Sequence, residues 1–420
     1  MSAESSKNQD MEPSRGSKTI CIPFESEEQY RHCLEKTAAY REHIESIARQ
    51  HVELFPHGFE QGFIFKGTYH STKQDIDLRR IKLVATGDTF QIRPSFLMPY
   101  MVGRTDDLEK ALFLRHFGVP FDALVHVFGK DSSFWYRVWA SLGRSSIVGS
   151  TIKSTNKLPA HIVADEKHTR LKGDKVYVAT TVANGCIVGA SAVSTPSTED
   201  LEAGYGDFAA EAREVDPSYS PQTVCVDGWE ATWNAWWRLF PTITVLLCFL
   251  HSAIKIRDCR GGDHALRFET LTRVWKAFRA ETKRSFSQRI RRLEQWVSKN
   301  LPNGKLRQAV VKLCGKRGFF AMAYDFVEPY RTSNAVDRLM NHQDRMLYAM
   351  RYFHGNLVSA RLAVRAMAML WNFHPYGARL RRKDGKRRSP FADVNGFEYH
   401  GNWLHNFLIA SSLGGHRPLN

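Results

Sequence analysis

Three aspartates, far apart in the chain, are the side chains with the clearest potential for chemistry. Asp165 and Asp227 end the short apolar runs "HIVAD" and "QTVCVD", and Asp337 lies in "RTSNAVD". Apolar runs of this length predict buried strands, and strand ends in a mixed sheet gather at one edge. Two carboxylates held together at such an edge repel each other unless a cation lies between them. The pattern therefore predicts a divalent metal site.

Oxygen ligands of this kind favour Mg²⁺ or Mn²⁺, which also bind the phosphate oxygens of a substrate. Two such ions can hold the attacking water and the leaving oxygen of a phosphodiester in line, so a third acid is expected. We assign it to Asp337, because a helix that begins near Ser333 or Asn334 puts that carboxylate in the first turn, where the helix dipole favours negative charge. The alternative is that Asp337 is only a favourable first-turn residue.

The composition points to a polyanionic partner. Of 420 residues, 59 are Lys or Arg and 43 are Asp or Glu, which gives a net charge of +16. Nucleic acid is the first expectation for such a chain, and a basic surface that only faces solvent is the alternative. Seven cysteines without a CxxC pair favour reduced thiols in a cytosolic compartment. No apolar stretch is long enough for a membrane span, and the polar start lacks the apolar core of a secretion signal.

The basic residues are concentrated in two segments. Residues 252–328 hold 18 Lys or Arg against 7 Asp or Glu, so most of the excess charge is there. The stretch "RLRRKDGKRR" at 379–388 is either a solvated loop or a strap that contacts phosphates. The DNA contacts predicted in these two segments are Arg284, Arg289, Arg291, Arg292, Lys299, Arg381, Arg382 and Lys383.

The elements that would position the first two aspartates follow one another in the middle of the chain. "HIVAD" predicts a strand that ends at Asp165, and "KVYVATTVANGCIVGASAV" predicts two strands joined at Asn184-Gly185, a hairpin signal. A helix over "STEDLEAGYGDFAAEAREV", the strand ending at Asp227, a helix over "EATWNAWWRLF" and a strand over "ITVLLCFLHS" complete the pattern. In this β-β-β-α-β-α-β order the first and fourth strands can lie side by side, which would make the two aspartates neighbours.

A region before these strands predicts a helix-turn-helix. Glycine breaks at Gly118 and Gly129 separate three short helical patterns, the first of them capped by Thr105. The third, from about Ser132 to Leu142, would enter the major groove of DNA. Its predicted DNA contacts are Lys130, Ser132, Ser133 and Arg137. A three-helix packing unit without DNA contact would have the same pattern, because the aromatic residues of the third helix are core-forming.

Taken in order, "VADEKH", "CVDGW", "CFLH" and "RTSNAVDRL" resemble the motifs of the DDE transposases of bacterial insertion sequences, and within them those related to the Mutator-like group. The resemblance covers about residues 105–375. It implies an RNase H-like catalytic domain in which Asp165 and Asp227 bind metal, while Cys248 and His251 form a supporting C-x-x-H signature. It also implies that the basic segment before the third acid is a helical insertion that contacts the DNA ends of the element.

Two positions depart from that family. An Asn-x-x-Glu pattern is usual at the third acid, whereas "NAVD" supplies Asp337, one methylene shorter, with Asn334 as a supporting residue. Glu328 and Asp344 are the other candidates for the third acid. Upstream, "IKLVATGDTF" resembles the second half of a zinc ribbon without its cysteines, so no zinc is predicted there.

The expected fold is α/β, with an RNase H-like mixed sheet, an all-helical insertion and a preceding helix-turn-helix region. The expected segments are a disordered tail (1–20), an N-terminal α+β region (21–104), the helix-turn-helix (105–150), the catalytic domain (151–251 and 329–375), the insertion (252–328) and a basic C-terminal segment (376–420).

The resemblance implies a DNA transposase that cleaves transposon ends with two Mg²⁺ or Mn²⁺ ions and transfers the 3′-OH to target DNA. Because both ends must be cut together, a dimer or larger assembly on double-stranded DNA is expected, in the bacterial cytoplasm with the nucleoid and without a membrane. Two alternatives stay open. One is a structure-selective nuclease on the same fold, and the other is a non-catalytic DNA-binding protein derived from a transposase, which the departure at Asp337 favours.

Overall fold

The computed structural model describes residues 18–259, 263–384 and 388–416, and the chain divides into two compact units. The terminal unit consists of the described residues up to Lys157, Glu211–Pro217 and those from Arg365 onward, and the central unit consists of Leu158–Ala210 and Ser218–Val364. Each unit combines helices with one mixed sheet, so the predicted α/β class is confirmed at that level.

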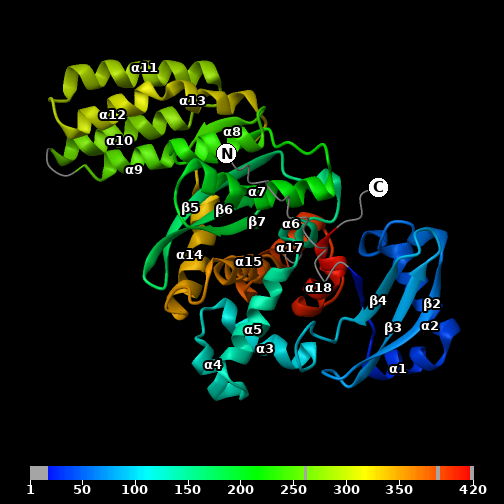
Figure 1. The fold of residues 1–420 in the computed structure, drawn as a ribbon. Coiled ribbons are helices and arrows are strands. Elements are labelled where there is room, and N and C mark those ends of the chain that lie inside the picture. The colour runs from blue at the N-terminus through cyan, green and yellow to red at the C-terminus, as the bar shows by residue number, and fades with distance from the viewer. Residues whose placement is uncertain (1–17, 260–262, 385–387, 417–420) are drawn as a thin grey trace, which may run out of the picture. The chain divides into compact units, whose positions relative to one another are not determined.

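A five-stranded mixed sheet lies in the middle of the central unit (Figure 1), with the strand order β7-β6-β5-β8-β9. Its strands are β5 (His161–Leu171), β6 (Asp174–Ala183), β7 (Cys186–Val193), β8 (Thr223–Val226) and β9 (Thr244–Leu247). Strands β5, β6 and β7 pair antiparallel, and β8 and β9 continue the sheet parallel to β5. The predicted hairpin is confirmed, because Asn184 and Gly185 both have positive φ, at 52° and 79°, as a tight two-residue turn requires.

Two strand ends differ from the prediction. Strand β5 does not end at Asp165 but continues to Leu171, because β6 pairs with it along that whole length. Only the parallel pairing of β5 with β8 stops early, and its last matched residues are Val163 and Cys225. Strand β9 ends at Leu247, so Cys248 is the N-cap of a helix and the predicted strand over "ITVLLCFLHS" is too long.

Helices cover both faces of this sheet (Figure 1). On one face lie α7 (Thr198–Val215) and α8 (Glu230–Leu239), and on the other lies α14 (Asn334–Ala349). Helix α7 approaches β7 closely, since a Cβ on Gly189 would stand only 2.7 Å from the Cβ of Phe208. Helix α14 is tied to the opposite face by the Gln343 side-chain amide, which donates a hydrogen bond to Thr180 Oγ1 at 3.2 Å.

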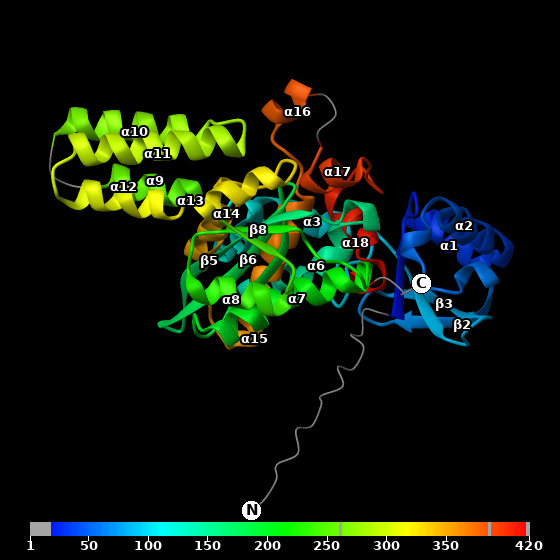
Figure 2. The ribbon, with the colours of Figure 1, turned by 90° about the horizontal axis from the view of Figure 1, so that it is seen from above.

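Every regular element that the structure describes between β9 and α14 is a helix, as predicted. Figure 2 shows its helices side by side. They are α9 (Phe249–Arg257), α10 (His264–Phe278), α11 (Lys283–Asn300), α12 (Lys305–Gly315) and α13 (Arg317–Ala321). In α11, Phe286, Ile290, Leu293 and Val297 are buried at helical spacing, so this helix has an apolar stripe against the bundle core and leaves its basic residues outside.

The terminal unit contains a four-stranded sheet of order β1-β4-β3-β2. Its strands are β1 (Thr19–Ile22), β2 (Phe63–Ser71), β3 (Ile76–Leu83) and β4 (Thr89–Pro94). The residues before β2 form two helices, α1 (Glu27–Glu35) and α2 (Thr37–Gln50), which are separate because Lys36 between them has an extended backbone. The segment after Lys383 belongs to this unit as well: Cys21 N–H donates to Ser412 Oγ at 3.1 Å, which joins the two ends of the chain in one fold.

The three helices predicted after Gly103 are present as α3 (Thr105–His116), α4 (Phe121–Phe128) and α5 (Ser132–Ser141). Thr105 is the first helical residue rather than the N-cap, because its Oγ1 donates to the Ser95 carbonyl at 2.8 Å instead of accepting from the helix. Asp131 caps α5 by accepting from the Phe134 N–H at 2.7 Å.

The remaining helices are α6 (Ile147–Thr151), α15 (Leu357–Phe373), α16 (Ala378–Asp384), α17 (Pro390–Asn395) and α18 (Trp403–Ala410). Short 3-10 helices are η2 (Val52–Leu54), η3 (Phe59–Gln61), η4 (Leu142–Arg144), η5 (Thr155–Lys157), η6 (Met322–Asp325) and η7 (Ser412–Gly415). Within the described ranges, no helix has both the length and the apolar character that crossing a membrane requires.

Candidate active site

Asp165 and Asp227 come together on adjacent strands of the central sheet. The last matched pair of β5 and β8 is Val163 with Cys225, and each aspartate lies two residues beyond its member of that pair. Asp165 lies within β5, whereas Asp227 directly follows Val226, the last residue of β8. The two carboxylates are close enough for the charge of one to act on the other. Burial, and next the negative charge of Asp227, raise the pKa of Asp165 to about 6. The predicted juxtaposition of the two acids is therefore present.

Backbone amides hold each of these carboxylates by one oxygen. Asp165 Oδ1 accepts from the Glu166 N–H at 2.8 Å, and Asp227 Oδ1 accepts from the Trp229 N–H at 3.0 Å. Between Asp227 and Trp229, Gly228 has a φ of 102°, a backbone conformation that favours glycine. Within the described residues, Oδ2 of neither aspartate accepts a hydrogen bond, so each keeps an oxygen for a ligand.

Asp337 lies on the same side of the sheet. Its helix, α14, begins at Asn334, so Asp337 is in the first turn as predicted. Thr180, which anchors α14, is the β6 partner of Asp165, and this fixes which face of the sheet the helix covers. Ser333 Oγ donates to Asp337 Oδ2 at 3.3 Å. Burial raises the pKa of Asp337, against the opposing positive charge of His251.

The other two candidates for the third acid, Glu328 and Asp344, have different surroundings from Asp337. Glu328 is exposed in the segment before α14, at a φ of 53°. Asp344 is exposed and forms an ion pair with Lys167, with Oδ1 and Nζ 2.7 Å apart. Asn334, predicted to support the site, is an exposed side chain at the start of α14. Of the three acids, only Asp337 is placed beside His251 and Ser333.

Cys248, His251 and Ser333 form a polar cluster that links β9 to α14. The Ser333 N–H donates to Cys248 Sγ at 3.1 Å, and Ser333 Oγ lies 3.5 Å from His251 Nδ1. Hydrogen bonding to Cys248 raises the pKa of His251 to about 9, and the charges of Asp165 and Asp227 act in the same direction. A protonated His251 therefore balances part of the negative charge of the aspartates.

Sequence reasoning missed one member of this site and one acid on the opposite face of the sheet. Ser333 was considered only as a possible helix start, yet it contacts Cys248, His251 and Asp337. Glu166 follows Asp165 and faces the opposite side of the sheet, where its Oε1 accepts from Tyr205 Oη and Thr232 Oγ1, each at 2.6 Å.

Burial raises the pKa of Glu166 to about 7. The sequence "VADEKH" shows that Glu166 follows Asp165. It does not show that Glu166 is buried, because this depends on β5 continuing past Asp165.

The carboxylate oxygens of the site are ligands that suit a hard divalent cation. In the described residues, however, they do not form a complete metal-binding group. Two partly buried carboxylates that repel each other are the environment in which an oxygen-binding cation is favourable. Among the described residues, no group of three or more His, Cys, Asp or Glu side chains is arranged to hold a metal ion. The hydrogen bond from Ser333 engages only Asp337 Oδ2, so within the described residues Oδ1 is left for a ligand, as one oxygen is in each of the other two aspartates.

The residues predicted to contact DNA through the third helix are mostly accessible. Lys130, Ser133 and Arg137 are exposed at the start and along one side of α5. Ser132 is engaged within the protein, because its Oγ donates to Asp122 Oδ1 at 2.8 Å. Lys130 has a φ of 61° in the turn that precedes the helix.

Some of the DNA contacts predicted in the basic segments are exposed, and others are engaged within the protein. Arg289 packs within the bundle, since its Nη1 donates to the Lys276 carbonyl at 2.6 Å. Arg381 is exposed on α16, and the side chains of Arg382 and Lys383 lie outside the described part of the structure. The predicted contacts that are exposed on α11 are Arg284, Arg291, Arg292 and Lys299.

A groove lined by lysines, which sequence reasoning did not single out, lies between α9 and α12. Its cationic lining residues are Lys255, Lys305, Lys312 and Lys316, and its lining contains no acid among the described residues. A Cβ built on Gly228 would stand 3.7 Å from Lys316 Nζ, so one end of the groove adjoins the residue after Asp227. These lysines were not recognisable as a set because they are spread over two helices more than forty residues apart.

Comparison with known proteins adds no assignment: the chain matches no protein-family model, and no curated protein matches it.

Proposed function

We propose that this protein is a DDE-type DNA transposase with an RNase H-like central sheet. The observation that carries the proposal is the meeting of Asp165 and Asp227 on adjacent parallel strands, with Asp337 delivered to the same face by α14. The sheet order β7-β6-β5-β8-β9 and the basic helical bundle between β9 and α14 support it. Both features agree with the arrangement that the sequence motifs imply.

Asp165, Asp227 and Asp337 are the residues that would hold two Mg²⁺ or Mn²⁺ ions. Such ions supply Lewis acidity for displacement at a phosphodiester. The backbone amides of Glu166 and Trp229 orient the first two carboxylates, and Ser333 orients the third. His251, held charged by Cys248, offsets part of the repulsion among them and would lie near the reacting phosphate.

Positive charge for the DNA backbone is available close to these acids. The lysine groove between α9 and α12 begins beside Gly228, so a strand whose scissile phosphate reaches Asp227 would have its neighbouring phosphates within reach of Lys316. Long, flexible lysine side chains bind phosphates without reading sequence. The exposed residues Lys130, Ser133 and Arg137 of the α5 region are proposed to help locate the element ends. Assembly as a dimer or larger complex on DNA belongs to the same proposal.

The deciding experiment uses the full chain, Mg²⁺ and duplex DNA that carries the sequences flanking its reading frame, with a second plasmid as target. We expect nicks that expose a 3′-OH at one flanking position, followed by covalent joining of that end to the target. Cleavage without joining would identify the structure-selective nuclease instead. Binding with no metal-dependent cleavage at any concentration would identify a non-catalytic DNA-binding protein.

A further inference from the structure

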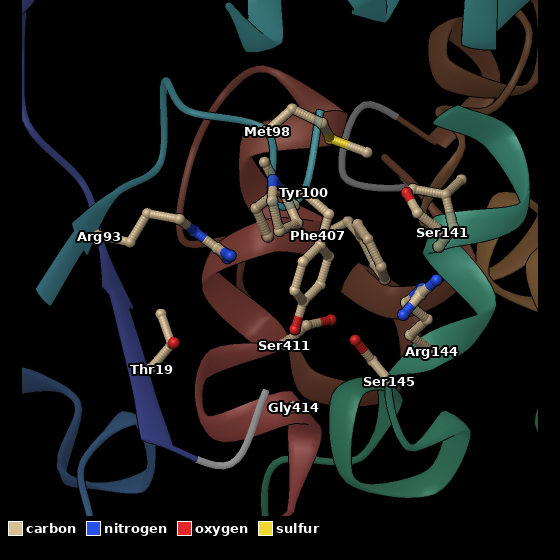
Figure 3. A pocket seen from close by; sticks show the side chains of 13 residues that line it. Thr19, Arg93, Met98, Tyr100, Ser141, Arg144, Ser145, Phe407, Ser411 and Gly414 are labelled. Carbon is tan, nitrogen blue, oxygen red and sulfur yellow. The ribbon is translucent and has the colours of Figure 1, made fainter. Parts of the chain in front are cut away.

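A pocket in the terminal unit brings two arginines together (Figure 3). It has a volume of about 330 Å³, which is within the range of small-molecule sites. Arg93 comes from β4 and Arg144 from η4, and their guanidinium groups point into the pocket from opposite sides. No Asp or Glu occurs among its described lining residues, so the pocket carries two positive charges and no negative one.

Neither guanidinium is neutralised by the described part of the chain. No carboxylate forms an ion pair with Arg93 or Arg144 there, and Arg93 Nε is buried without a hydrogen-bond partner. The neighbour of Arg93 across the strand pair is Cys21, whose thiol hydrogen-bonds to Arg93. Burial raises the pKa of this thiol, so it stays neutral and does not balance the charge of Arg93. A buried donor on a cation is unfavourable unless an acceptor reaches it, and the pocket is where an acceptor from outside could enter.

Tyr100 forms an aromatic wall of the pocket, and its backbone is strained. Its φ is 65°, in the left-handed region that a bulky side chain rarely adopts. The Arg144 guanidinium lies 5.1 Å from the centre of its ring. Strain of this kind persists where surrounding structure holds it and is common at ligand clamps.

Hydroxyl groups and apolar side chains complete the lining. Thr19 and Ser145 present hydroxyls to the pocket, whereas Ser411 Oγ donates to Ser150 Oγ at 3.1 Å, and Met98 and Phe407 line the pocket with apolar surface. Polar groups that can donate to an anion are therefore combined with a surface suited to a flat, apolar group. This combination distinguishes the pocket from the lysine groove, which is lined chiefly by flexible cations.

We propose that this pocket binds a phosphomonoester attached to a planar base, as in a nucleoside 5′-monophosphate or the 5′-phosphorylated end of a DNA strand. Two guanidinium forks match the oxygen geometry of phosphate. A phosphomonoester carries close to two negative charges at neutral pH, whereas an internal phosphodiester carries one, so the monoester balances both arginines. The base would stack on Tyr100, beside Arg144. The site belongs to the terminal unit and does not depend on the proposed transposase chemistry.

The test measures binding to the full chain by calorimetry without divalent metal, so that the aspartate site does not turn over DNA. The probes are deoxyadenosine 5′-monophosphate, deoxyadenosine, and a short oligonucleotide with and without a 5′-phosphate. We expect saturable binding of the phosphorylated probes that is at least about tenfold tighter than that of their unphosphorylated partners, because hydrogen bonds to charged groups are among the strongest. Affinity should fall below about pH 6, where the phosphate gains its second proton.

Substitutions then assign the binding to the pocket. R93Q and R144Q should each weaken binding of deoxyadenosine 5′-monophosphate by about tenfold or more. Arg144 is exposed, so R144Q removes its charge without disturbing a core, and R93K keeps the charge at the more buried position as a check on folding. R49Q, which removes an exposed arginine at the end of α2, is the matched control and should leave binding of deoxyadenosine 5′-monophosphate unchanged.

Two comparisons decide the outcome. A phosphorylated oligonucleotide that binds more tightly than the mononucleotide supports a DNA end as the ligand, and the reverse supports a free nucleotide. The proposal is overturned if neither phosphorylated probe binds saturably, if the unphosphorylated probes bind as tightly, or if R144Q and R93Q bind like the unaltered chain.

Discussion

The aspartate site of the central unit and the arginine pocket of the terminal unit each collect like charges, but they hold them in different ways. Asp165 and Asp227 have short side chains on neighbouring strands, and backbone amides fix one oxygen of each. Arg93 and Arg144 have long side chains, and the guanidinium of Arg144 lies over the ring of Tyr100, an exposed tyrosine. The first arrangement suits a compact cation in a fixed geometry, whereas the second can adjust to a larger anion.

The difference also lies in what surrounds the charges. His251 already offsets part of the negative charge among the aspartates, and burial together with Asp227 still raises the pKa of Asp165. In the pocket, the described residues supply no acid at all. Unbalanced charge that a fold retains indicates a partner from outside, and its sign and spacing indicate which kind.

The largest effect should come from removing one of the two strand aspartates. Asp227→Asn keeps the shape of the side chain but removes a charge that would hold the cation, so metal-dependent cleavage should fall by about 1,000-fold or more, the equivalent of about 4 kcal/mol of Lewis-acid stabilisation. Binding of DNA in a gel-shift assay should change little, since the phosphate contacts remain. Asp165→Asn should behave alike.

Asp344→Asn is the matched control, because this exposed carboxylate is paired with Lys167 rather than directed at the site. If it abolishes cleavage while Asp337→Asn does not, the third acid has been misassigned. If all of these variants cleave normally, the metal-site proposal fails.

A smaller loss is expected when the third acid is lengthened rather than removed. Asp337→Glu restores the residue usual in the resembling family, but the added methylene can displace the oxygen by about 1 Å, which costs up to roughly 100-fold in rate. Asp337→Asn should lose cleavage as completely as Asp227→Asn. Single-turnover cleavage rates at saturating Mg²⁺ measure both, and Asp337→Glu activity below that of Asp337→Asn would contradict the assignment.

The charge imbalance at Asp165 should also be visible in stability. Because the folded pKa of about 6 lies above the ordinary value of about 3.9, the folded state binds this proton more tightly, and stability is lost as pH rises from about 4 to 6. In chelator, Asp165→Asn should therefore be more stable than the unaltered chain at pH 7.5, by up to about 3 kcal/mol, and not at pH 4.

Urea denaturation at the two pH values measures this difference. Addition of Mg²⁺ at pH 7.5 should stabilise the unaltered chain more than Asp165→Asn. A gain for Asp165→Asn that is equal at both pH values would show that packing, and not charge, is responsible.

The smallest effect should come from charges that are already in contact with water. Lys305 and Lys312 are exposed in the groove. Because these lysines are proposed to contact phosphates and not bases, K305Q/K312Q should weaken binding to every DNA sequence by the same factor. The slope of log affinity against log salt concentration should become shallower by about 0.9 for each DNA phosphate that the variant no longer neutralises. The matched double variant R291Q/R292Q on α11 tests the surface predicted from sequence. An unchanged slope for the lysine variant, with a reduced slope for the α11 variant, would move the DNA path from the groove to α11.

The parts of the fold that short-range signals specify were predictable. The Asn184-Gly185 turn, the strand and helix order around Asp227 and the start of α14 follow from local preferences and from the spacing of apolar residues. Asp165 and Asp227 could be placed together because strand order determines which strand ends are neighbours. The end of β5 was not predictable, since β6 decides how far that strand is paired.

The identity and order of the acids, the location of the basic segment and the elements on both sides of them could be read from the amino-acid sequence. Folding, in contrast, places Asp337 beside Ser333 and His251 and pairs Asp344 with Lys167, and no local pattern predicts either contact. Folding alone also assembled the lysine groove and the pocket of Arg93 and Arg144. The physical reason is that a residue's neighbours along the chain specify its backbone conformation, whereas its charge environment depends on packing between distant segments.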